Sequence, residues 1–330
     1  KRGTHLITAV DRLVRLSGEF QRICLSATVK NKKSVAEFIG GFEFKGPNQA
    51  PEYNARHVEI IDSAMTKTYS VRVKYPKKED AKLEKTVWDL LAEEFKGIVE
   101  KNRSTLFFTN GRRLCEKMTF KINSLSGQPL AYSHHGSLSR ELRQNVEQNL
   151  KAGDLKAIVA TSSLEMGIDI GSLDEVVMVQ SPPSISAAVQ RVGRAGHMVG
   201  KESRGTFYCA HAQDLIPSAV IARAIADQDI ETIVPIESPL DVLAQVLISE
   251  TGLEVRDLDE LYAQIRTSWP YRNLSREHYD LVVNMLAGRY SDTRIRELNP
   301  RVYVDRLDNT IEAKKGALLA LYSSGGTIPD

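Results

Sequence analysis

The sequence predicts an α/β protein, with a doubly wound parallel sheet followed by a smaller helical module. Strand-like and helix-like patterns alternate between about residue 69 and residue 226, with short connections. Strands that alternate with helices form parallel sheets covered on both faces. Beyond Pro235–Pro239 the pattern changes to three amphipathic helices and two short strand-like pieces, which is typical of a winged-helix module.

The first 46 residues read as one helix–strand–helix unit. Apolar residues recur near helical spacing over residues 4–17, and residues 33–40 predict a second helix that ends at Gly40–Gly41. Between them, Arg22–Ser26 predicts a short buried strand. Residues 46–51 are rich in turn formers and predict a linker. We expect residues 1–46 to be the end of a domain whose beginning is missing.

The elements after the linker follow in order. The predicted strands cover residues 69–75, 104–108, 130–133, 157–161, 175–180 and 205–209, and the predicted helices cover 80–101, 111–123, 139–151, 184–195 and 214–226. The module after them contains predicted helices at 240–250, 257–266 and 275–288, with strand-like pieces at 302–305 and 310–312. The predicted domains are therefore 1–46, 47–235 and 236–330.

Composition excludes several classes of protein. The chain has 330 residues with 42% hydrophobic residues, enough for a core, and no apolar run long enough for a membrane helix. The 44 Lys and Arg residues nearly balance the 42 Asp and Glu residues, which excludes a histone-like basic protein. The three cysteines have no CxxC spacing, so a disulfide framework or zinc ribbon is not expected and a reducing, cytoplasmic compartment fits. The sequence begins without a signal peptide and without an initiator Met.

Small polar residues follow four predicted strands at the point where each strand ends. They are Ser26–Thr28, Thr109–Arg113, Ser133–Ser137 and Thr161–Ser163. In a doubly wound sheet, ligands gather at the carboxyl ends of the strands. Hydroxyl groups, glycines and helix N-termini there supply donors for phosphate. A single Ser or Thr at such a junction is usually only a helix cap, but four on one edge predict a phosphate site.

The segment Gln190–His197 is the strongest candidate for a binding site. Arg191 and Arg194 are three residues apart and share one helix face, close to Gly193 and Gly196. Two guanidinium groups on one face suit a polyphosphate. The alternative is a helix that ends at Gly196 and carries two solvated arginines.

These segments together resemble a known family. Ser26–Thr28, Ala160–Asp169 and Gln190–His197 are similar, in this order, to motifs III, V and VI of superfamily two helicases. The particular residues in these motifs resemble those of the Lhr (large helicase-related) group, as do Gly288–Tyr290 and the closing Ser324–Asp330. This resemblance covers nearly the whole chain. The resemblance implies that residues 47–235 are the second of two RecA-like motor domains.

The resemblance also implies roles for the residues of motifs V and VI. Arg194 would be the arginine finger that stabilises charge on the γ-phosphate of ATP. Gln190 would lie near the γ-phosphate or the attacking water, and Arg191 would help to organise the cleft. Gly167 and Asp169 would lie beside the nucleotide. Many relatives carry a second arginine where this chain has His197, to which we assign a supporting role.

The remaining implied roles concern nucleic acid. Thr161 and Ser162 of motif V would contact the backbone of a single strand. Thr109 and Gly136 fall where related helicases contact the phosphates of that strand. Ser26 and Thr28 would couple the nucleotide state to domain closure. The expected substrates are single-stranded DNA or DNA/RNA hybrids, in a repair-related role.

Two elements of an ATPase do not occur in the sequence. It contains no GxxxxGK[ST] loop and no DExH box, and neither Asp174–Val177 nor Asp259–Tyr262 is a substitute. The family places both elements ahead of Ser26, in a first RecA-like domain that would grip the ATP phosphates and hold Mg²⁺. The resemblance therefore implies that this chain does not hydrolyse ATP alone and needs the missing first domain as a partner.

Weaker candidates are interpreted as structural. The pair His134–His135 has no partner at metal-ligand spacing. The lysines between residues 74 and 85 suit a solvated surface, although phosphate contact is an alternative. Trp269, Tyr271 and Tyr279 are interpreted as core, while base stacking stays open because of nearby arginines: Arg272, Arg276, Arg289, Arg294 and Arg296.

Two other functions remain open on the sequence. The chain could be a non-catalytic nucleic-acid-binding or regulatory module derived from a helicase. It could also be an unrelated α/β enzyme, which leaves the ordered motifs unexplained.

Overall fold

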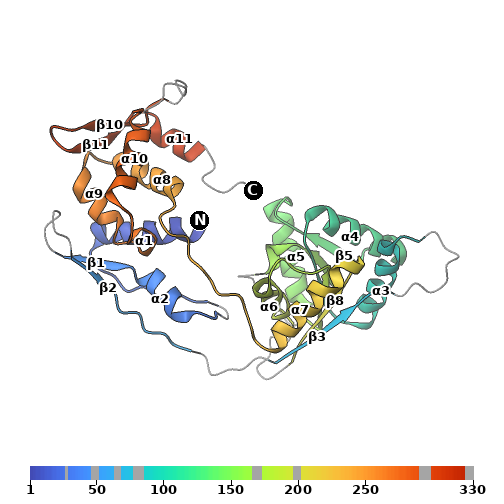
Figure 1. Ribbon diagram of the computed structural model, residues 1–330. Coiled ribbons are helices and arrows are strands. Elements are labelled where there is room, and N and C mark those ends of the chain that lie inside the picture. Colours follow the sequence, from blue (N-terminus) through green and yellow to red (C-terminus); the bar gives the residue numbers. More distant parts are fainter. Residues whose placement is uncertain are drawn as a thin grey trace. The chain divides into compact units, whose positions relative to one another are not determined.

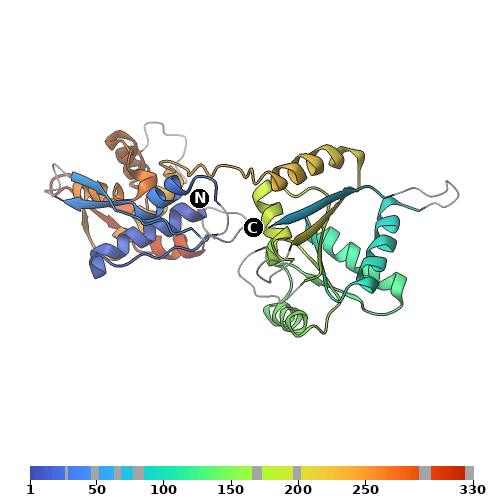
Figure 2. The same ribbon diagram turned by 90° about the horizontal axis from the view of Figure 1, so that it is seen from below.

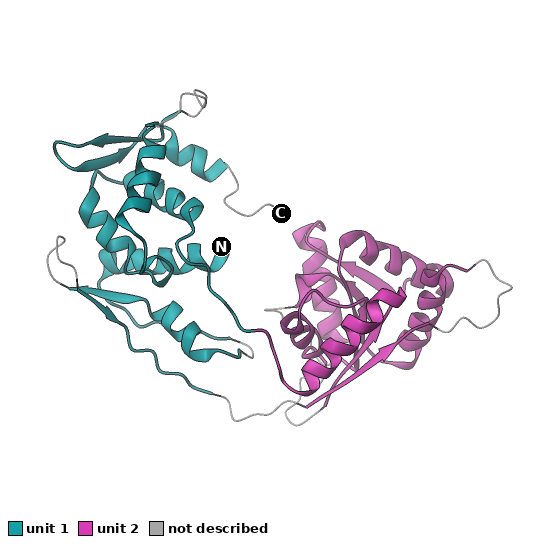
Figure 3. Ribbon diagram, in the orientation of Figure 1, with its two compact units in different colours: residues 1–62, 232–330 teal, residues 63–231 magenta. Residues whose placement is uncertain are grey.

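The chain divides into two compact units. The computed structural model describes residues 1–26, 29–45, 52–62, 68–76, 85–165, 173–195, 202–289 and 299–323. Unit 2 comprises residues 63–231, and unit 1 comprises residues 1–62 together with 232–330 (Figure 3). None of the helices in these described ranges combines the length and apolarity of a bilayer-crossing segment.

Unit 2 is built on a six-stranded parallel sheet of order β3-β8-β7-β4-β6-β5. The strands are β3 (Tyr69–Lys74), β4 (Thr105–Thr109), β5 (Ala131–His134), β6 (Ala157–Ala160), β7 (Glu175–Val179) and β8 (Ser203–Tyr208). The helices are α3 (Val87–Lys101), α4 (Arg112–Ser126), α5 (Arg140–Ala152), α6 (Ile185–Val192) and α7 (Leu215–Ala226), with 3₁₀ turns η1 (Ser162–Leu164) and η2 (Ala212–Asp214). This RecA-like fold confirms the predicted doubly wound sheet.

Both faces of the sheet are buried under helices, as Figures 1 and 2 allow the reader to follow. Phe107 and its neighbours on one face pack against α3 and α4. Phe108 points to the opposite face, into a core shared with α5, α6 and α7. Successive side chains of a strand point to opposite faces, so the apolar centre of β4, residues 106–108, needs cover on both sides. This is why its sequence reads as a continuous apolar run.

Local signals fix where the helices of unit 2 begin. α3 begins at Val87, seven residues after the predicted start, because Thr86 and Asp89 form a reciprocal capping box. Ser139 accepts from the backbone N–H of Leu142 at the start of α5. Ser184 does the same for Ala187 at the start of α6. These caps place the first turn of each helix next to the strand that precedes it.

The C-terminal part of unit 1 is a winged helix. Its elements are α8 (Leu240–Thr251), β9 (Arg256–Asp257), α9 (Leu258–Ile265), η3 (Trp269–Tyr271), α10 (Arg276–Leu286), β10 (Val302–Asp305), β11 (Thr310–Ala313) and α11 (Ala317–Ser323). The strands form a small antiparallel sheet of order β10-β11-β9. Tyr271 and Tyr279 are fully buried in the core, as predicted.

The N-terminal part of the chain packs onto this winged helix. It contains α1 (Arg2–Ser17), α2 (Lys32–Gly40), β1 (Phe42–Lys45) and β2 (Glu52–Ala55). The Phe42 N–H donates to the Thr267 carbonyl, and the Tyr53 hydroxyl donates to the Ala263 carbonyl. β2 pairs with β1, so the chain stays in unit 1 as far as residue 62 rather than leaving at the predicted boundary of 46. That residues 1–46 belong to a first motor domain stays a prediction.

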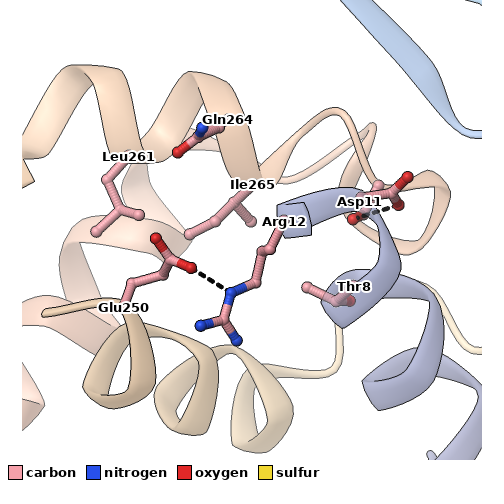
Figure 4. Close-up of a pocket in the computed structure, with 8 residues that line it drawn as sticks. Thr8, Asp11, Arg12, Glu250, Leu261, Gln264 and Ile265 are labelled. Atoms are coloured by element: carbon pink, nitrogen blue, oxygen red, sulfur yellow. Dashed lines mark hydrogen bonds and ion pairs between the residues drawn. The ribbon is translucent and has the colours of Figure 1, made fainter. Parts of the chain in front are cut away.

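The buried face of α1 is mixed, because Thr4, Thr8 and Asp11 are buried there together with Ile7. Thr8, Asp11 and Arg12 point toward α8 and α9 around a cavity of about 10 Å³ (Figure 4). The Arg12 Nε donates to the Glu250 carboxylate, and the Ser268 hydroxyl donates to Asp11, 2.7 Å away. Burial raises the pKa of Asp11, against the lowering effect of Ser268, Arg22 and Arg56. The apolar side chains Leu6, Leu13 and Leu16 are left exposed.

The predicted strand at Arg22–Ser26 does not form. This segment pairs with no strand among the described residues, and Ile23 and Leu25 are 76% and 95% exposed. Arg22 alone is held, by Asp11 at 2.6 Å and by the carbonyls of Ile39 and Gly40. An apolar run forms a buried strand only where a sheet edge receives it, and no described strand of unit 1 pairs with this segment.

Candidate functional site

The predicted polar residues of unit 2 lie at the carboxyl edge of the sheet. Thr109 and His134 are the last residues of β4 and β5, and Thr161 follows β6 directly. Phe108 and His134 both lie in register with Ala160, at the end of β6. The Thr161 N–H donates to the His134 carbonyl over 3.2 Å. The sequence predicts that four segments lie at the carboxyl edge of one sheet. The three of them that belong to unit 2 do lie at one continuous sheet edge.

Helix α6 carries Gln190 and Arg191, and Arg194 lies in the turn that follows it. Its N-terminus is fixed by the Ser184 cap and by the Glu231 carboxylate, which accepts from the N–H groups of Ile185 and Ser186. The Ala188 and Val192 side chains are buried against the sheet. This anchoring positions Gln190 and Arg191 in the last turn of the helix and Arg194 two residues after its end.

A glycine allows α6 to approach the sheet closely. A Cβ on Gly205 of β8 would lie only 2.8 Å from the Val192 Cγ2 atom, and Val192 is fully buried. We expect Gly205→Ala to lower the free energy of unfolding of unit 2 by about 1–3 kcal/mol, because a packed branched side chain must move. Denaturant unfolding measures this. Gly97→Ala serves as the control, since a Cβ there meets nothing within 4 Å, and equal stability losses for both variants would contradict the close approach.

Arg191 is an internal anchor rather than a solvated side chain. It is only 3% exposed. Its Nε and Nη2 lie 2.7 and 2.6 Å from the Glu165 carboxylate, its Nη1 donates to the Asn110 side chain, and its guanidinium lies over the Phe108 ring. This corrects the alternative of two solvated arginines. It also limits Arg191 to organising the site, because every part of its guanidinium is occupied within unit 2.

Arg194 is partly exposed at the same place. Its Nε and Nη2 donate to the Glu165 carbonyl at 3.2 and 2.6 Å. Burial lowers the pKa of Arg194, although a guanidinium stays charged at neutral pH. Gln190 is also partly exposed, at the end of α6. A positive charge is therefore held at the sheet edge within reach of solvent.

The predicted nucleic-acid residues divide into two groups. Thr109 is fully buried, and its hydroxyl donates to the carbonyls of Gly111 and Ala160. A contact between Thr109 and the phosphates of a nucleic-acid strand stays a prediction, and this burial disfavours its side chain as the contacting group. Gly136 and Ser162 are exposed and Thr161 is partly exposed. These three residues stay candidates for contact with the sugar-phosphate backbone of a nucleic-acid strand.

The histidine pair is held by carboxylates. His134 is buried, with Nδ1 2.8 Å from the Ser163 hydroxyl and Nε2 2.9 Å from the Glu147 carboxylate. Burial lowers the pKa of His134 more than Glu147 raises it. The His135 Nε2 lies 2.6 Å from Glu116. Within the described ranges, no cluster of three or more His, Cys, Asp or Glu residues is placed to hold a metal ion.

Some predicted residues cannot be placed. Thr28, Gly167, Asp169 and His197 lie outside the described residues. Ser26 is exposed in unit 1.

Glu165 and Asn110 are the site residues that the sequence did not single out. Both contact Arg191, and Glu165 also contacts Arg194. The sequence contains a signal for Glu165, because its carboxylate lies between the apolar residues Leu164 and Met166 of motif V. A buried carboxylate needs a cationic partner, and the two arginines of motif VI were the available ones.

Comparison with known proteins decides the family. The family described as "Large helicase-related protein, winged helix domain" matches residues 223–330, and "Helicase conserved C-terminal domain" matches residues 86–199. The chain belongs to the Lhr group of helicases. The Escherichia coli "Lhr helicase/uracil glycosylase" is 35% identical over all of this chain and 24% of its own length. The Thermococcus barophilus "ATP-dependent helicase Lhr-Core protein 2" is 35% identical over all of this chain and 38% of its own length.

Solved structures agree with this assignment to the Lhr group. A structure of Mycobacterium smegmatis helicase Lhr bound to ssDNA and AMP-PNP matches the whole chain with a TM-score of 0.89 and 38% identity, over 41% of that protein. The DUF1998 helicase MrfA bound to DNA shares the fold at 18% identity, with a TM-score of 0.63 over 95% of this chain and 40% of its own. This Lhr chain thus spans well under half of the length of these relatives.

Proposed function

We propose that this chain supplies the second motor domain and the winged helix of an ATP-dependent helicase or translocase that acts on single-stranded nucleic acid. The observation that carries the proposal is the pair Arg191 and Arg194, both bound to Glu165, which follows the turn η1 after β6. Its relatives include ATP-dependent helicases.

Arg194 is the proposed arginine finger. Phosphoryl transfer spreads negative charge over the γ-phosphate oxygens, and a positioned guanidinium stabilises that charge. Gln190 lies in the last turn of α6, four residues before Arg194, and is proposed to orient the water or the γ-phosphate. Arg191 stays inside unit 2 and holds the end of the helix. Gly167 and Asp169 are proposed to lie beside the nucleotide. Magnesium would arrive with ATP and be held by acids of the first motor domain.

Single-stranded nucleic acid is proposed to lie along the same sheet edge. Gly136, Thr161 and Ser162 are the exposed or partly exposed candidates there. Arg112 donates to the Ser137 hydroxyl beside Gly136, which keeps a cation near the proposed backbone path. A related Lhr helicase is described as bound to ssDNA. DNA is therefore the first substrate to test, with DNA/RNA hybrids second, and a repair role fits either.

A first RecA-like domain is the proposed partner. The exposed side chains Leu6, Leu13 and Leu16 of α1, with Ile23 and Leu25, form an apolar surface that a soluble protein normally covers. Ser26 and Thr28 come directly after this surface in the sequence. We propose that the first domain covers it and that Ser26 and Thr28 then couple the nucleotide state to closure. The three cysteines are free, which suits the cytoplasm.

The proposal is tested by measuring ATP hydrolysis and the separation of nucleic-acid strands. Both are measured with the full-length protein and with this chain alone. The full-length protein should hydrolyse ATP with single-stranded DNA present and unwind tailed DNA or hybrid duplexes. This chain alone should bind single strands without ATPase activity. Strand binding by the full-length protein without any ATP hydrolysis would favour a non-catalytic binding or regulatory module instead.

A further inference from the structure

One residue, Glu165, contacts both arginines of the proposed ATP site through different atoms. Its carboxylate accepts from the Arg191 Nε at 2.7 Å and lies 2.6 Å from the Arg191 Nη2. Its backbone carbonyl accepts from the Arg194 Nε at 3.2 Å and from the Arg194 Nη2 at 2.6 Å. The side chain of one residue thus fixes the first arginine while its peptide group fixes the second.

The position of Glu165 is set by rigid surroundings. It follows the 3₁₀ turn η1 at the end of β6, where its N–H donates to the Ser162 carbonyl. The preceding residue, Leu164, is fully buried in the core of the sheet face that α6 covers. The carboxylate itself is mostly buried, with its side chain 16% exposed. A charge pair buried to this degree holds its geometry, because separating it leaves an uncompensated charge in the interior.

The direction of the Arg194 guanidinium depends on this peptide group. Two of its N–H groups are directed at one carbonyl oxygen, which defines the plane of the guanidinium. The Glu165 carboxylate is one of the contacts that hold residue 165. Without it the backbone there keeps the Ser162 hydrogen bond and the Leu164 anchor but loses its tie to Arg191, and its carbonyl can shift. The Arg194 side chain would then shift with it. Displacement of a reacting group by about 1 Å can cost about 100-fold in rate.

We propose that Glu165 is a positioning residue that aims Arg194 at the γ-phosphate. This inference rests on the function proposed above and deepens it, because it names what holds the finger in place. Glu165 itself touches neither nucleotide nor strand in this assignment. Its effect must therefore pass through Arg194 and appear in the rate of hydrolysis, while the affinity for ATP and for single strands changes little.

The test uses the full-length protein with Glu165→Ala and Glu165→Gln. We expect Glu165→Ala to lower kcat of the DNA-stimulated ATPase by about 10- to 100-fold, as supporting residues around a site typically do, with KM for ATP little changed. The Gln side chain keeps one acceptor for Arg191 but loses the charge, so kcat should be intermediate. Glu175→Gln is the matched control, because Glu175 begins β7 at the opposite edge of the sheet and accepts from the Thr206 hydroxyl at 2.7 Å.

A double-mutant cycle separates positioning from a general effect on the fold. Glu165→Ala should cause no further loss of kcat in an Arg194→Ala protein, because the group that Glu165 positions is already gone. An additional loss there, or an unchanged kcat in folded Glu165→Gln and Glu165→Ala proteins, overturns the inference. If Glu165→Ala does not fold, the Gln variant decides alone. A wild-type protein without DNA-stimulated ATPase would instead refute the proposed function itself.

Discussion

Replacing Arg194 with Ala in the full-length protein is expected to lower kcat of the DNA-stimulated ATPase by about 10³-fold or more, the usual contribution of an arginine finger. The substitution removes a partly exposed cation whose Nε and Nη2 donate to the Glu165 carbonyl, a neutral acceptor. Steady-state ATPase assays with saturating single-stranded DNA measure the change. Affinity for single strands, measured without nucleotide, should stay close to that of the wild type.

Two further variants show whether the loss is specific. Arg204→Ala removes an arginine of the same unit that is 71% exposed and pairs with Glu202, so it should leave kcat unchanged. Arg194→Lys keeps a charge but not the planar fork of donors, and its kcat should stay far below the wild-type value. Wild-type turnover by Arg194→Ala would show that the finger lies elsewhere. Equal losses for Arg194→Ala and Arg204→Ala would point to a nonspecific effect of charge.

The central sheet could be predicted from the sequence because its signals are local. β4 is fully buried with an apolar centre, and the helices from α4 to α7 each follow a strand within a short connection. Such runs are typical of parallel strands covered on both faces. The start of α3 was placed too early because the residues before Thr86 are good helix formers, and the capping box sets the boundary instead.

Unit 1 could not be predicted in the same way because its contacts join distant parts of the chain. β1 and β2 have four residues each, and their docking onto Thr267 and Ala263 spans more than 200 positions. The spacing of apolar residues in α1 indicated a helix correctly. It could not show that the polar side, including Asp11, faces the winged helix while the leucines stay exposed.

The candidate site was predicted in part. Strand order placed the ends of β4, β5 and β6 at one sheet edge, and these ends pair in register in the described residues. The role of Arg194 stays a prediction. Motif spacing could not separate the buried Arg191 and Thr109 from the exposed Gly136, because burial depends on neighbours from other segments. The basic character expected of the winged helix also disappears. Arg272 pairs with Glu237, and Arg276 pairs with two aspartates, while Arg294 and Arg296 lie outside the described residues.

Trp269→Ala is expected to lower the free energy of unfolding of unit 1 by about 3–5 kcal/mol, the typical cost of removing a large aromatic side chain from a core. Trp269 is only 7% exposed. Its ring meets Phe38 of α2 edge-on at 5.7 Å, and the Arg272 guanidinium lies 3.5 Å from its centroid. The side chain therefore joins the N-terminal segment to the winged helix. Amide hydrogen exchange over α8–α10 measures the loss in this unit alone.

The same variant decides between core and base stacking. A stacking residue would contribute about 1–3 kcal/mol to single-strand affinity, whereas a core residue should leave the affinity of the folded protein unchanged. Trp88→Ala is the matched control, because Trp88 lies on α3 in unit 2, beneath the Lys117 ammonium. Its removal should speed exchange in unit 2 and leave α8–α10 protected. If Trp269→Ala weakened the binding of single-stranded nucleic acid while amide exchange over α8–α10 stayed slow, Trp269 would be a stacking platform. The packing of α2 against the winged helix would then depend on polar contacts between them.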